Sequence, residues 1–289
     1  MSNDHRIKNI TKELTRQFFE IGIDTAALDA RWLIEAVSGV NQTTLILEPE
    51  IALTEDQFIR LQVMVERRKR FEPVAKILGE KEFYGRAFKV TKDVLDPRPD
   101  TETLIDVVLK SELEDTALRF LDVGVGSGAI AITLLCEKLN WQGVASDISD
   151  KVLAIASENR ETLGVADRLV FVKTSWMSGI DGLFDFIVSN PPYIGSAEID
   201  ELSQDVKNYD PVLALDGGDD GLEAYRQIAL TSGALLKPQG KIYLEIGYTQ
   251  ASQVIDIFRS VGFLIPKTPD CITKDLGGND RVITLMWDR

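Results

Sequence analysis

Apolar and polar positions follow two different periods along the chain, and the first part has the period of helices. Over residues 6–22 the apolar side chains recur every three or four positions, which is the spacing of one buried helix face. These side chains are Ile7, Ile10, Leu14, Phe18 and Phe19. Similar spacing predicts helices over residues 26–37 and 56–70, with no strand pattern between them. Residues 1–75 are therefore predicted to form a small helical bundle.

Polar residues mark the expected ends of these helices. Asp24 is expected to cap the helix over residues 26–37, and Gly39 to end it. Thr54 followed by Gln57 is a capping-box pattern, in which the two side chains and backbone N–H groups bond reciprocally. The third helix should therefore begin directly after this threonine.

The period changes over residues 76–97, where apolar positions flank a turn at Gly85. This pattern predicts two short strands, and we interpret the segment as a β-hairpin linker. Beyond it, Asp100 or Thr101 is expected to cap a helix over residues 103–110.

From residue 118 onward, short apolar runs alternate with helical stretches. The expected strands are residues 119–123, 143–146, 169–172, 184–188 and 241–246, and then 263–265 and 281–286 without an obvious helix between them. Strand–helix alternation predicts an α/β fold with a mostly parallel sheet covered on both faces. The final pair predicts an antiparallel hairpin at one edge. Residues 98–289 are therefore expected to form one α/β domain.

Composition narrows the choice of partners and location. The net charge of -14 opposes a wide grip on nucleic-acid phosphates. No apolar run approaches the roughly 20 residues that a membrane span needs, and residues 1–16 lack the pattern of a secretory signal or transit peptide. Cys136 and Cys271 lie far apart without a CxxC motif, which favours free thiols in a reducing compartment. We therefore expect a cytoplasmic protein without a membrane partner.

Two further features concern metals and partners. His5 is the only histidine and lies close to the N-terminus, so no metal site is expected. The run Arg67-Arg68-Lys69-Arg70 is either a solvated helix end, where cations complement the helix dipole, or a contact with a partner. The sequence leaves both interpretations open.

A glycine-rich segment joins the strand expected at 119–123 to the following helix. Its G-x-G-x-G spacing permits a tight turn and close approach of a ligand, and it differs from the dinucleotide and P-loop patterns. Asp147 ends the next expected strand, where a carboxylate can accept hydrogen bonds from both hydroxyls of an adenosine ribose. The alternative for the glycine segment is a plain turn without a ligand, and the alternative for Asp147 is a helix cap. The predicted cofactor contacts are Asp122, Gly124, Val125, Gly126, Ser127, Gly128 and Asp147.

A second motif, Asn190-Pro191-Pro192-Tyr193, follows the fourth expected strand of this domain. The prolines fix φ and lack N–H groups, so the loop is rigid and presents carbonyl oxygens. The oxygen of Asn190 and a proline carbonyl supply two acceptors for the two hydrogens of a planar NH2 group. Tyr193 offers a ring against which a flat group can stack. A plain turn is again the alternative.

These acceptors suit methyl transfer to a planar amide nitrogen, which is a poor nucleophile. Two accepted hydrogen bonds draw electron density toward the nitrogen and align it. The methylated, protonated amide is a very strong acid, so no dedicated base is required. Catalysis would rest on positioning, worth up to ~7–11 kcal/mol in favourable cases, and on desolvation.

Over nearly its whole length the chain resembles the release-factor N(5)-glutamine methyltransferases, the HemK/PrmC family. The tetrad alone is only moderately specific, because DNA and RNA amino-methyltransferases share it. The ordered set of motifs is highly specific. It comprises residues 83–88, 94–102, 121–132, 190–193, 210–218, 220–226, 244–247, 274–276 and 280–282.

The resemblance implies a seven-stranded, Rossmann-like class I S-adenosylmethionine-dependent methyltransferase domain behind a helical domain. Because a planar amide is a small feature, we expect the helical domain to help recognise the protein substrate. It implies that residues 124–128 bind the methionine part of the cofactor, that Asp147 binds the ribose and that Trp176 lies near the adenine. Residues 190–193 are expected to hold the substrate amide, with Asn190 also facing the cofactor. The implied substrate is the glutamine of the Gly-Gly-Gln motif in class 1 peptide release factors. We expect a monomer that makes no direct contact with nucleic acid.

The chain departs from the family pattern at two positions. Ser175 stands where the family often has Asp before the tryptophan, and Asp96 replaces a usual apolar residue. Three rival functions remain: an adenine amino-methyltransferase, a glutamine methyltransferase of a ribosomal protein, and a non-catalytic cofactor-binding protein. The acidic balance disfavours the first, and residues 97–102 resemble the release-factor branch more than the second. The intact Asn190 and glycine segment argue against the third.

Overall fold

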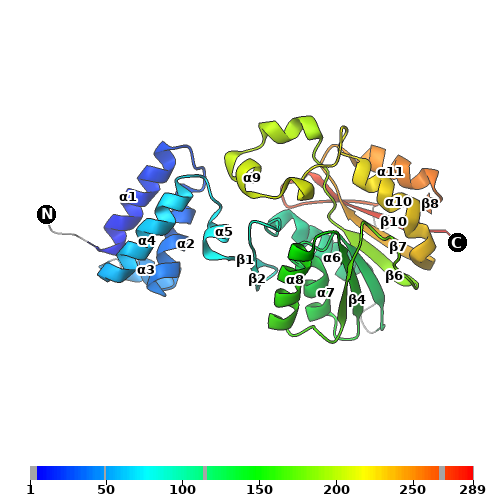
Figure 1. Ribbon diagram of the computed structural model, residues 1–289, viewed down its shortest axis with the longest axis horizontal. Helices are drawn as coiled ribbons and strands as arrows, with labels where there is room; N and C mark the ends of the chain where they lie inside the picture. The colour runs from blue at the N-terminus through cyan, green and yellow to red at the C-terminus, as the bar shows by residue number, and fades with distance from the viewer. Residues whose placement is uncertain (1–4, 49, 113–115, 267–270, 289) are drawn as a thin grey trace. The chain divides into compact units, whose positions relative to one another are not determined.

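The computed structural model describes residues 5–48, 50–112, 116–266 and 271–288, and it divides into two compact units (Figure 1). The N-terminal unit contains Met1–Gly79 and Ser203–Tyr209, and the sheet unit contains Glu80–Leu202 and Asp210–Arg289. The sequence placed boundaries after residues 75 and 97, with a hairpin linker between them. The structure groups the hairpin with the sheet unit and adds a later segment to the N-terminal unit.

The N-terminal unit is built of helices, and its described residues also contain one isolated β-bridge between Arg6 and Ala52. Its helices are α1 (Ile7–Glu20), α2 (Ala26–Ser38), α3 (Gln42–Leu47), α4 (Glu55–Arg68), α5 (Val74–Leu78) and α9 (Gln204–Tyr209). In α1 the buried side chains are those at the predicted spacing, except that Phe19 is exposed. The short helices α3 and α5 were not predicted, because six and five residues are too few for a periodic pattern.

The ends of α2 and α4 test the predicted caps. At α4, Thr54 and Gln57 form the predicted capping box, with N···O distances of 3.3 and 2.9 Å. Gly39 ends α2 in the left-handed conformation, at φ 71°, as predicted. The prediction for Asp24 was wrong: Thr25 occupies the N-cap position, and its side chain makes no cap hydrogen bond.

A buried ion pair joins α2 to the end of α4. The Arg68 guanidinium donates to the Asp29 carboxylate at 2.7 Å, and the Thr25 hydroxyl donates to the same carboxylate at 2.9 Å. Arg67 forms an ion pair with Glu72 at 2.5 Å. The basic run is therefore partly internal, which the interpretation as a solvated helix end did not anticipate.

The strands of the sheet unit follow the predicted runs closely. They are β1 (Glu80–Phe83), β2 (Arg86–Lys89), β3 (Arg119–Val123), β4 (Gln142–Asp147), β5 (Leu169–Lys173), β6 (Phe184–Ser189), β7 (Leu236–Glu245), β8 (Phe263–Leu264), β9 (Ile272–Lys274) and β10 (Asp280–Trp287). Strands β1 and β2 form the predicted hairpin, and the others form one eight-stranded sheet.

The sheet order is β5-β4-β3-β6-β7-β10-β8, with β9 also paired to β10. Strands β3 to β7 are parallel, and β10 is antiparallel to its neighbours β7, β8 and β9. The predicted mostly parallel sheet is confirmed. The predicted edge hairpin was partly right, because β8 and β10 pair but β10 lies inside the sheet. The short strand β9 raises the strand number above the seven that the family resemblance implies.

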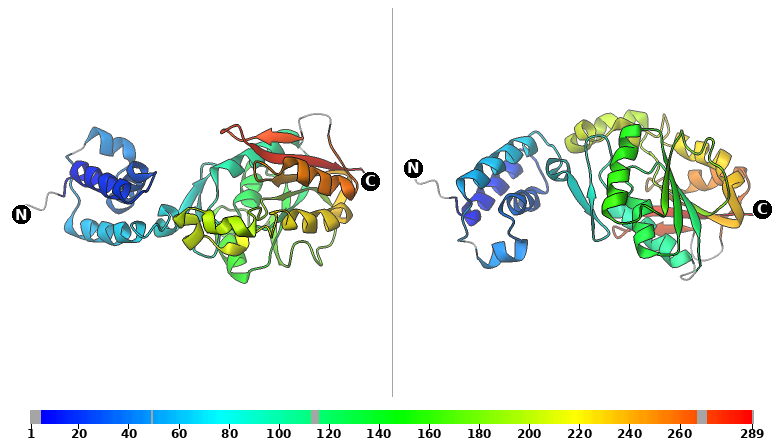
Figure 2. Two further views of the ribbon diagram at one scale, coloured as in Figure 1. Left: turned by 90° about the horizontal axis from the view of Figure 1, so that it is seen from above. Right: turned by 60° about the horizontal axis from the view of Figure 1, so that its bottom comes forward.

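Helices cover both faces of this sheet (Figures 1 and 2). Helices α6 (Glu102–Ser111), α7 (Ala129–Glu137) and α8 (Asp150–Thr162) contribute to one hydrophobic core. Helices α10 (Glu223–Leu235) and α11 (Ala251–Ser260) contribute to the core on the other face. Within the described ranges, no helix is long and apolar enough to cross a bilayer.

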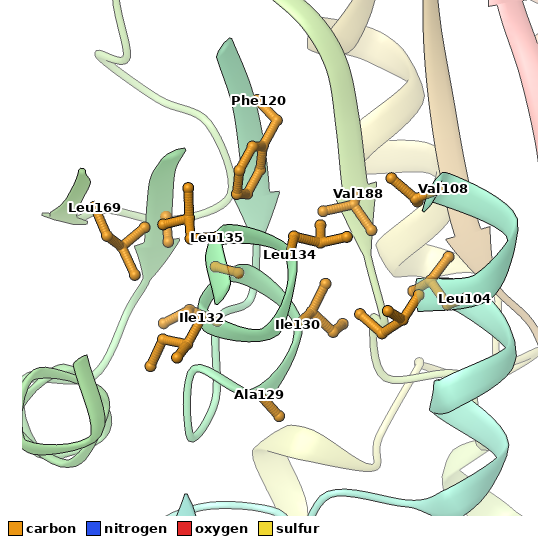
Figure 3. Close-up of a cluster of buried hydrophobic side chains, with 14 of the residues drawn as sticks. Leu104, Val108, Phe120, Ala129, Ile130, Ile132, Leu134, Leu135, Leu169 and Val188 are labelled. Atoms are coloured by element: carbon orange, nitrogen blue, oxygen red, sulfur yellow. The ribbon is translucent and has the colours of Figure 1, made fainter. Parts of the chain in front are cut away.

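Helix α7 is buried on all its sides. Residues 129–135 are all buried, as expected for a helix that is apolar all round. Figure 3 shows its side chains among Phe120 of β3, Leu169 of β5 and Val188 of β6, with Leu104 of α6 beside them. The glycine segment of residues 124–128 is therefore followed directly by a tightly packed helix.

The strand order brings the two sequence motifs together. From β3 the chain builds β4 and β5 on one side and then crosses over to β6 on the other side. The carboxyl ends of β3 and β6 thus flank a topological switch point, where open α/β sheets bind ligands. The glycine segment follows β3 and the tetrad follows β6.

Candidate active site

A cavity of about 460 Å³ lies at the carboxyl ends of β3, β4 and β6. This volume is in the range of small-molecule sites, roughly 300–1,000 Å³. Eight of the predicted site residues line this cavity: Gly124, Val125, Gly126, Ser127, Asp147, Trp176, Asn190 and Pro192. The predicted residues Asp122, Gly128, Pro191 and Tyr193 are not among its lining residues.

The glycine segment is a tight loop that exposes its backbone to the cavity. The N–H groups of Gly124 and Val125 both donate to the Ser146 carbonyl at 2.9 Å. Gly124 and Gly126 are left-handed, with φ of 80° and 54°, and open space lies where a Cβ would stand. Gly128 differs, because its Cβ would approach the Ile132 side chain to 2.6 Å. Gly128 therefore serves close packing of α7 rather than the cavity wall.

The two carboxylates predicted for this site have different environments. Asp147 lines the cavity, and its oxygens accept from the N–H groups of Ser149 at 3.0 Å and Gly126 at 3.4 Å. Burial raises the pKa of Asp147, although these N–H groups oppose the shift. Asp122 is fully buried away from the cavity and accepts from the Ala131 N–H at 3.1 Å. Burial raises the pKa of Asp122 to about 7.

Asp122 is therefore better described as an anchor of the glycine loop than as a contact of the cofactor. One of its oxygens bonds the first turn of α7, and the other has no hydrogen-bond partner in the described part of the chain. The sequence could not separate these roles, because both require a carboxylate at the end of a strand.

The tetrad is held rigidly at the end of β6. The Ser189 hydroxyl donates to the Val123 carbonyl at 2.6 Å, which ties β6 to β3. Pro191 is buried, whereas Asn190 and Pro192 lie on the cavity wall. The Tyr193 ring packs against the core beneath α10 and α11 instead of lining the cavity. Burial raises the pKa of Tyr193 to about 12.

The backbone after the tetrad is fastened to a second loop. Gln250 donates to the Tyr193 carbonyl at 2.9 Å. The Ile194 N–H donates to the Leu215 carbonyl at 3.0 Å, and the Ile194 carbonyl accepts from the Gly217 N–H at 2.8 Å. A Cβ at Gly221 would stand 2.5 Å from the Tyr193 carbonyl oxygen. The glycine-rich motif at residues 217–221 thus permits the close approach that holds the tetrad.

The tryptophan predicted near the adenine also lines the cavity. Trp176 has a positive φ of 54°, and its carbonyl accepts from the Ser146 hydroxyl at 2.8 Å. Its ring also contacts the second core, so packing and ligand contact are combined in one side chain. The two departures from the family pattern, Ser175 and Asp96, both lie on the cavity wall.

Several lining residues were given no role by the sequence reasoning. The segment of residues 92–98 crosses one side of the cavity, and Thr101, Leu213 and Ala214 also line it. The family resemblance included most of these positions but assigned them no contact. Thr101 was missed for a specific reason: its place before a helix favoured a cap, yet its hydroxyl is bonded elsewhere.

Within residues 5–48, 50–112, 116–266 and 271–288, no group of three or more His, Cys, Asp and Glu side chains is arranged to hold a metal. In the described part of the chain, neither Cys136 nor Cys271 forms a disulfide. A glycine loop after β3, a carboxylate at the end of β4 and an Asn-Pro-Pro-Tyr tetrad after β6 together define a Rossmann-like amino-methyltransferase.

Comparison with known proteins identifies the family. Family models for the PrmC N-terminal domain and for the methyltransferase small domain match residues 9–79 and 96–207. The release factor glutamine methyltransferase of Agrobacterium fabrum is 42% identical over 267 residues, covering 91% of both chains. That of Caulobacter vibrioides is 41% identical over 265 residues, covering 91% of this chain and 90% of the relative. The chain belongs to the family of release factor glutamine methyltransferases.

A solved structure supports the fold. The catalytic domain of hMettl16, in complex with an RNA hairpin, has a TM-score of 0.56 at 17% identity and covers 84% of both chains. At this identity the likeness extends to the fold alone.

The protein is therefore an enzyme that uses S-adenosylmethionine, and its cavity fits that cofactor. Gly124 and Gly126 leave open space beside their backbone, which a side chain at either position would fill. Asp147 presents a carboxylate to the same cavity, where hydroxyl groups of a ribose can donate to it.

Proposed function

We propose that this enzyme transfers a methyl group from S-adenosylmethionine to the side-chain amide nitrogen of the glutamine in the Gly-Gly-Gln motif of class 1 peptide release factors. The observation that carries the proposal is that Asn190 and Pro192 share one cavity with the glycine loop. An amide-binding wall and a cofactor-binding wall therefore face a common space. The relatives at 41–42% identity are named release factor glutamine methyltransferases, which supports this substrate.

Residues of three strand ends hold the cofactor in this proposal. Backbone groups of residues 124–127 bind its methionine part, Asp147 accepts from the ribose hydroxyls, and Trp176 lies against the adenine. Bound there, S-adenosylmethionine supplies an electrophilic methyl group.

The tetrad orients the substrate amide. The side-chain oxygen of Asn190 and a proline carbonyl accept the two amide hydrogens, which keeps the nitrogen aligned and rich in electron density. These acceptors bind more strongly as the nitrogen becomes positive, so they favour the transition state over the ground state. The only histidine, His5, belongs to the N-terminal unit. A base is unnecessary, because a protonated N-methyl amide releases its proton to water.

The choice of one glutamine among many requires contacts beyond a planar amide. We assign these contacts to the helical N-terminal unit. A peptide that carries only the Gly-Gly-Gln sequence should therefore be methylated with a higher KM than the intact factor. We further propose that the enzyme is a cytoplasmic monomer that binds no nucleic acid directly, since its net charge is -14.

The proposal is tested by incubating a purified class 1 release factor with the enzyme and isotope-labelled S-adenosylmethionine. Mass spectrometry should locate one methyl group on the glutamine of the Gly-Gly-Gln motif. Parallel incubations should contain a ribosomal-protein mixture and an adenine-containing oligonucleotide. Label on either of these, with none on the factor, would replace the proposed substrate by one of its rivals.

A further inference from the structure

Behind the cavity wall, a chain of two hydrogen bonds leads from Asn190 into the protein. The Asn190 Nδ2 donates to the Thr101 Oγ1 at 3.1 Å, and this hydroxyl donates to the Glu245 Oε2 at 2.6 Å. The three residues come from separate elements: the end of β6, the 3₁₀ turn Pro99–Thr101 and the end of β7. Asn190 and Thr101 line the cavity, whereas Glu245 does not.

The chemistry of these groups determines the direction of both hydrogen bonds. An ionised carboxylate only accepts, so the Thr101 hydroxyl must donate its single proton to Glu245. The threonine oxygen is then left as an acceptor, and only the NH2 end of Asn190 can donate to it. The Asn190 Oδ1 receives no hydrogen bond from the described residues. That oxygen is therefore available to accept from a ligand.

We propose that Thr101 and Glu245 are positioning residues that hold the Asn190 amide with its oxygen ready to accept the substrate NH2 group. An asparagine side chain has nearly equal shape in its two flipped orientations, and one of them would present two donors to the two hydrogens of the substrate. The two hydrogen bonds from Asn190 through Thr101 to Glu245, called the relay below, exclude the orientation that presents donors to the substrate. This inference rests on the proposed function, since it concerns the acceptor of the substrate amide.

The burial of Glu245 supports a purpose beyond folding. Its side chain is 1% exposed, and no cation among the described residues lies within ion-pair distance of it. The nearby Arg281 is bonded instead to Asp275 at 3.0 Å and to the Ile246 carbonyl at 3.1 Å. A buried carboxylate without a direct ion pair lowers stability, and such groups cluster at functional sites.

The protonation state of Glu245 gives the relay a signature. Burial raises the pKa of Glu245 to about 7, opposed by the Thr101 hydroxyl, by the charge of Arg281 and by the side-chain NH2 group of Asn190, which also lies close to this carboxylate. The titratable and charged groups that face it are Arg281, Asp100, Tyr193 and Tyr225. Both tyrosines have pKa values raised by burial and stay neutral near pH 7.

A neutral Glu245 can donate to Thr101, which can then donate to the Asn190 oxygen. The relay would run backwards and turn the NH2 group of Asn190 toward the substrate. Turnover should therefore fall as the pH is lowered through about 7. The affinity for the cofactor should not follow this titration, because Glu245 does not line the cavity.

The first test compares Thr101→Val with Thr101→Ser on an intact release factor. Valine keeps the shape but removes the hydroxyl, so kcat should fall about 10- to 100-fold, the size expected for a misplaced catalytic group. Serine restores the hydroxyl and should recover most of that loss. The KM for the factor and the affinity for S-adenosylhomocysteine should change little in both variants.

Thr133→Val is the matched control. Thr133 in α7 is fully buried, and its hydroxyl has no hydrogen-bond partner in the described part of the chain. The same chemical change should leave kcat unaltered there. Thermal unfolding and S-adenosylhomocysteine binding check that each variant is folded.

The second test is the pH profile of Glu245→Gln, whose amide does not titrate. Its kcat should be lowered at pH 8 and should lose the decline below pH 7 that the wild type has. An acid decline that persists in this variant, or a Thr101→Val enzyme with wild-type kcat, would overturn the proposal. Equal losses in Thr101→Val and Thr101→Ser would also overturn it. A wild-type enzyme that leaves the glutamine unlabelled would instead contradict the proposed function.

Discussion

Some buried carboxylates of this protein are paired with a cation and others are not. The sheet unit contains both kinds, since its buried Asp275 is paired with Arg281 at 3.0 Å. In the N-terminal unit, the buried carboxylate of Asp29 faces the buried guanidinium of Arg68 at 2.7 Å. In the sheet unit, Asp122 and Glu245 are buried with no cation at ion-pair distance among the described residues, and burial raises both pKa values to about 7. Glu245 is the last residue of β7, and Asp122 lies one residue before the end of β3.

The difference separates structural charge from functional charge. A paired buried charge is compensated locally and serves the packing of α2 against α4. An unpaired buried carboxylate destabilises the fold, so its presence beside a cavity needs a reason in binding or catalysis. Four experiments test this distinction.

The largest expected effect is on the stability of the N-terminal unit. Asp29→Ala leaves Arg68 buried without its carboxylate, which typically costs about 3–5 kcal/mol. Chemical denaturation should report the loss, while the affinity for S-adenosylhomocysteine stays unchanged in the folded enzyme. Glu13→Ala removes an exposed ion pair with Arg16 and should have little effect. A mild loss in Asp29→Ala would mean that the buried pair is not structural.

The next effect is on turnover. Asn190→Ala removes an acceptor of the substrate amide but leaves the glycine loop in place. Loss of one preorganised hydrogen bond of this type lowers the rate by about 10²–10³, so kcat should fall steeply with little change in cofactor affinity. Asn190→Asp keeps the acceptors and should be less impaired. Near-normal turnover of Asn190→Ala on a release factor would contradict the amide-clamp mechanism.

The affinity for the cofactor should depend on Asp147, whose carboxylate lines the cavity. Asp147→Ala removes the carboxylate that accepts from the ribose, a loss of roughly 1.5–3 kcal/mol for each charged hydrogen bond. Calorimetry with S-adenosylhomocysteine should register this loss in the presence of a chelator. Unaltered affinity would remove Asp147 from the cofactor site, and binding that vanished on chelation would reveal a metal.

The smallest effect is the pH dependence of stability. Asp122 and Glu245 have folded-state pKa values near 7, above those of the unfolded chain, so the folded state holds more protons between about pH 4 and 7. Their contribution therefore favours folding at acid pH and is lost as the pH rises toward 7. Glu245→Gln should flatten this part of the stability profile, by an amount on the order of 1–3 kcal/mol. An unchanged slope would mean that Glu245 ionises as in the unfolded chain.

Periodicity predicted the large elements, because each strand and long helix has a buried face. The strand predicted at 119–123 matches β3 residue for residue. Helices α3 and α5 and strand β9 escaped, since three to six residues show no period. The position of β10 inside the sheet depends on pairing between distant segments, which no local pattern encodes.

The sequence likewise predicted the parts of the site that are continuous along the chain and missed those that only the fold brings together. The glycine loop and the tetrad are continuous in sequence, so their residue types revealed them. Thr101 and Glu245 are separated by 144 residues, and only the folded sheet brings them together. Asp122 and Tyr193 have the residue types of ligand contacts, but their side chains face the protein interior.

The packing of helix α7 has a consequence for hydrogen exchange. Its residues from Ala129 to Leu135 are all buried, and amides in such elements exchange only when the domain unfolds globally. The cofactor loop ends at Gly128, directly on this helix. Its backbone donors therefore keep their positions whether or not a ligand is present, and binding loses little entropy to the ordering of the loop. Isotope exchange in α7 should be among the slowest of the sheet unit, and bound S-adenosylhomocysteine should slow it further, because a ligand of the folded state raises the free energy of global unfolding.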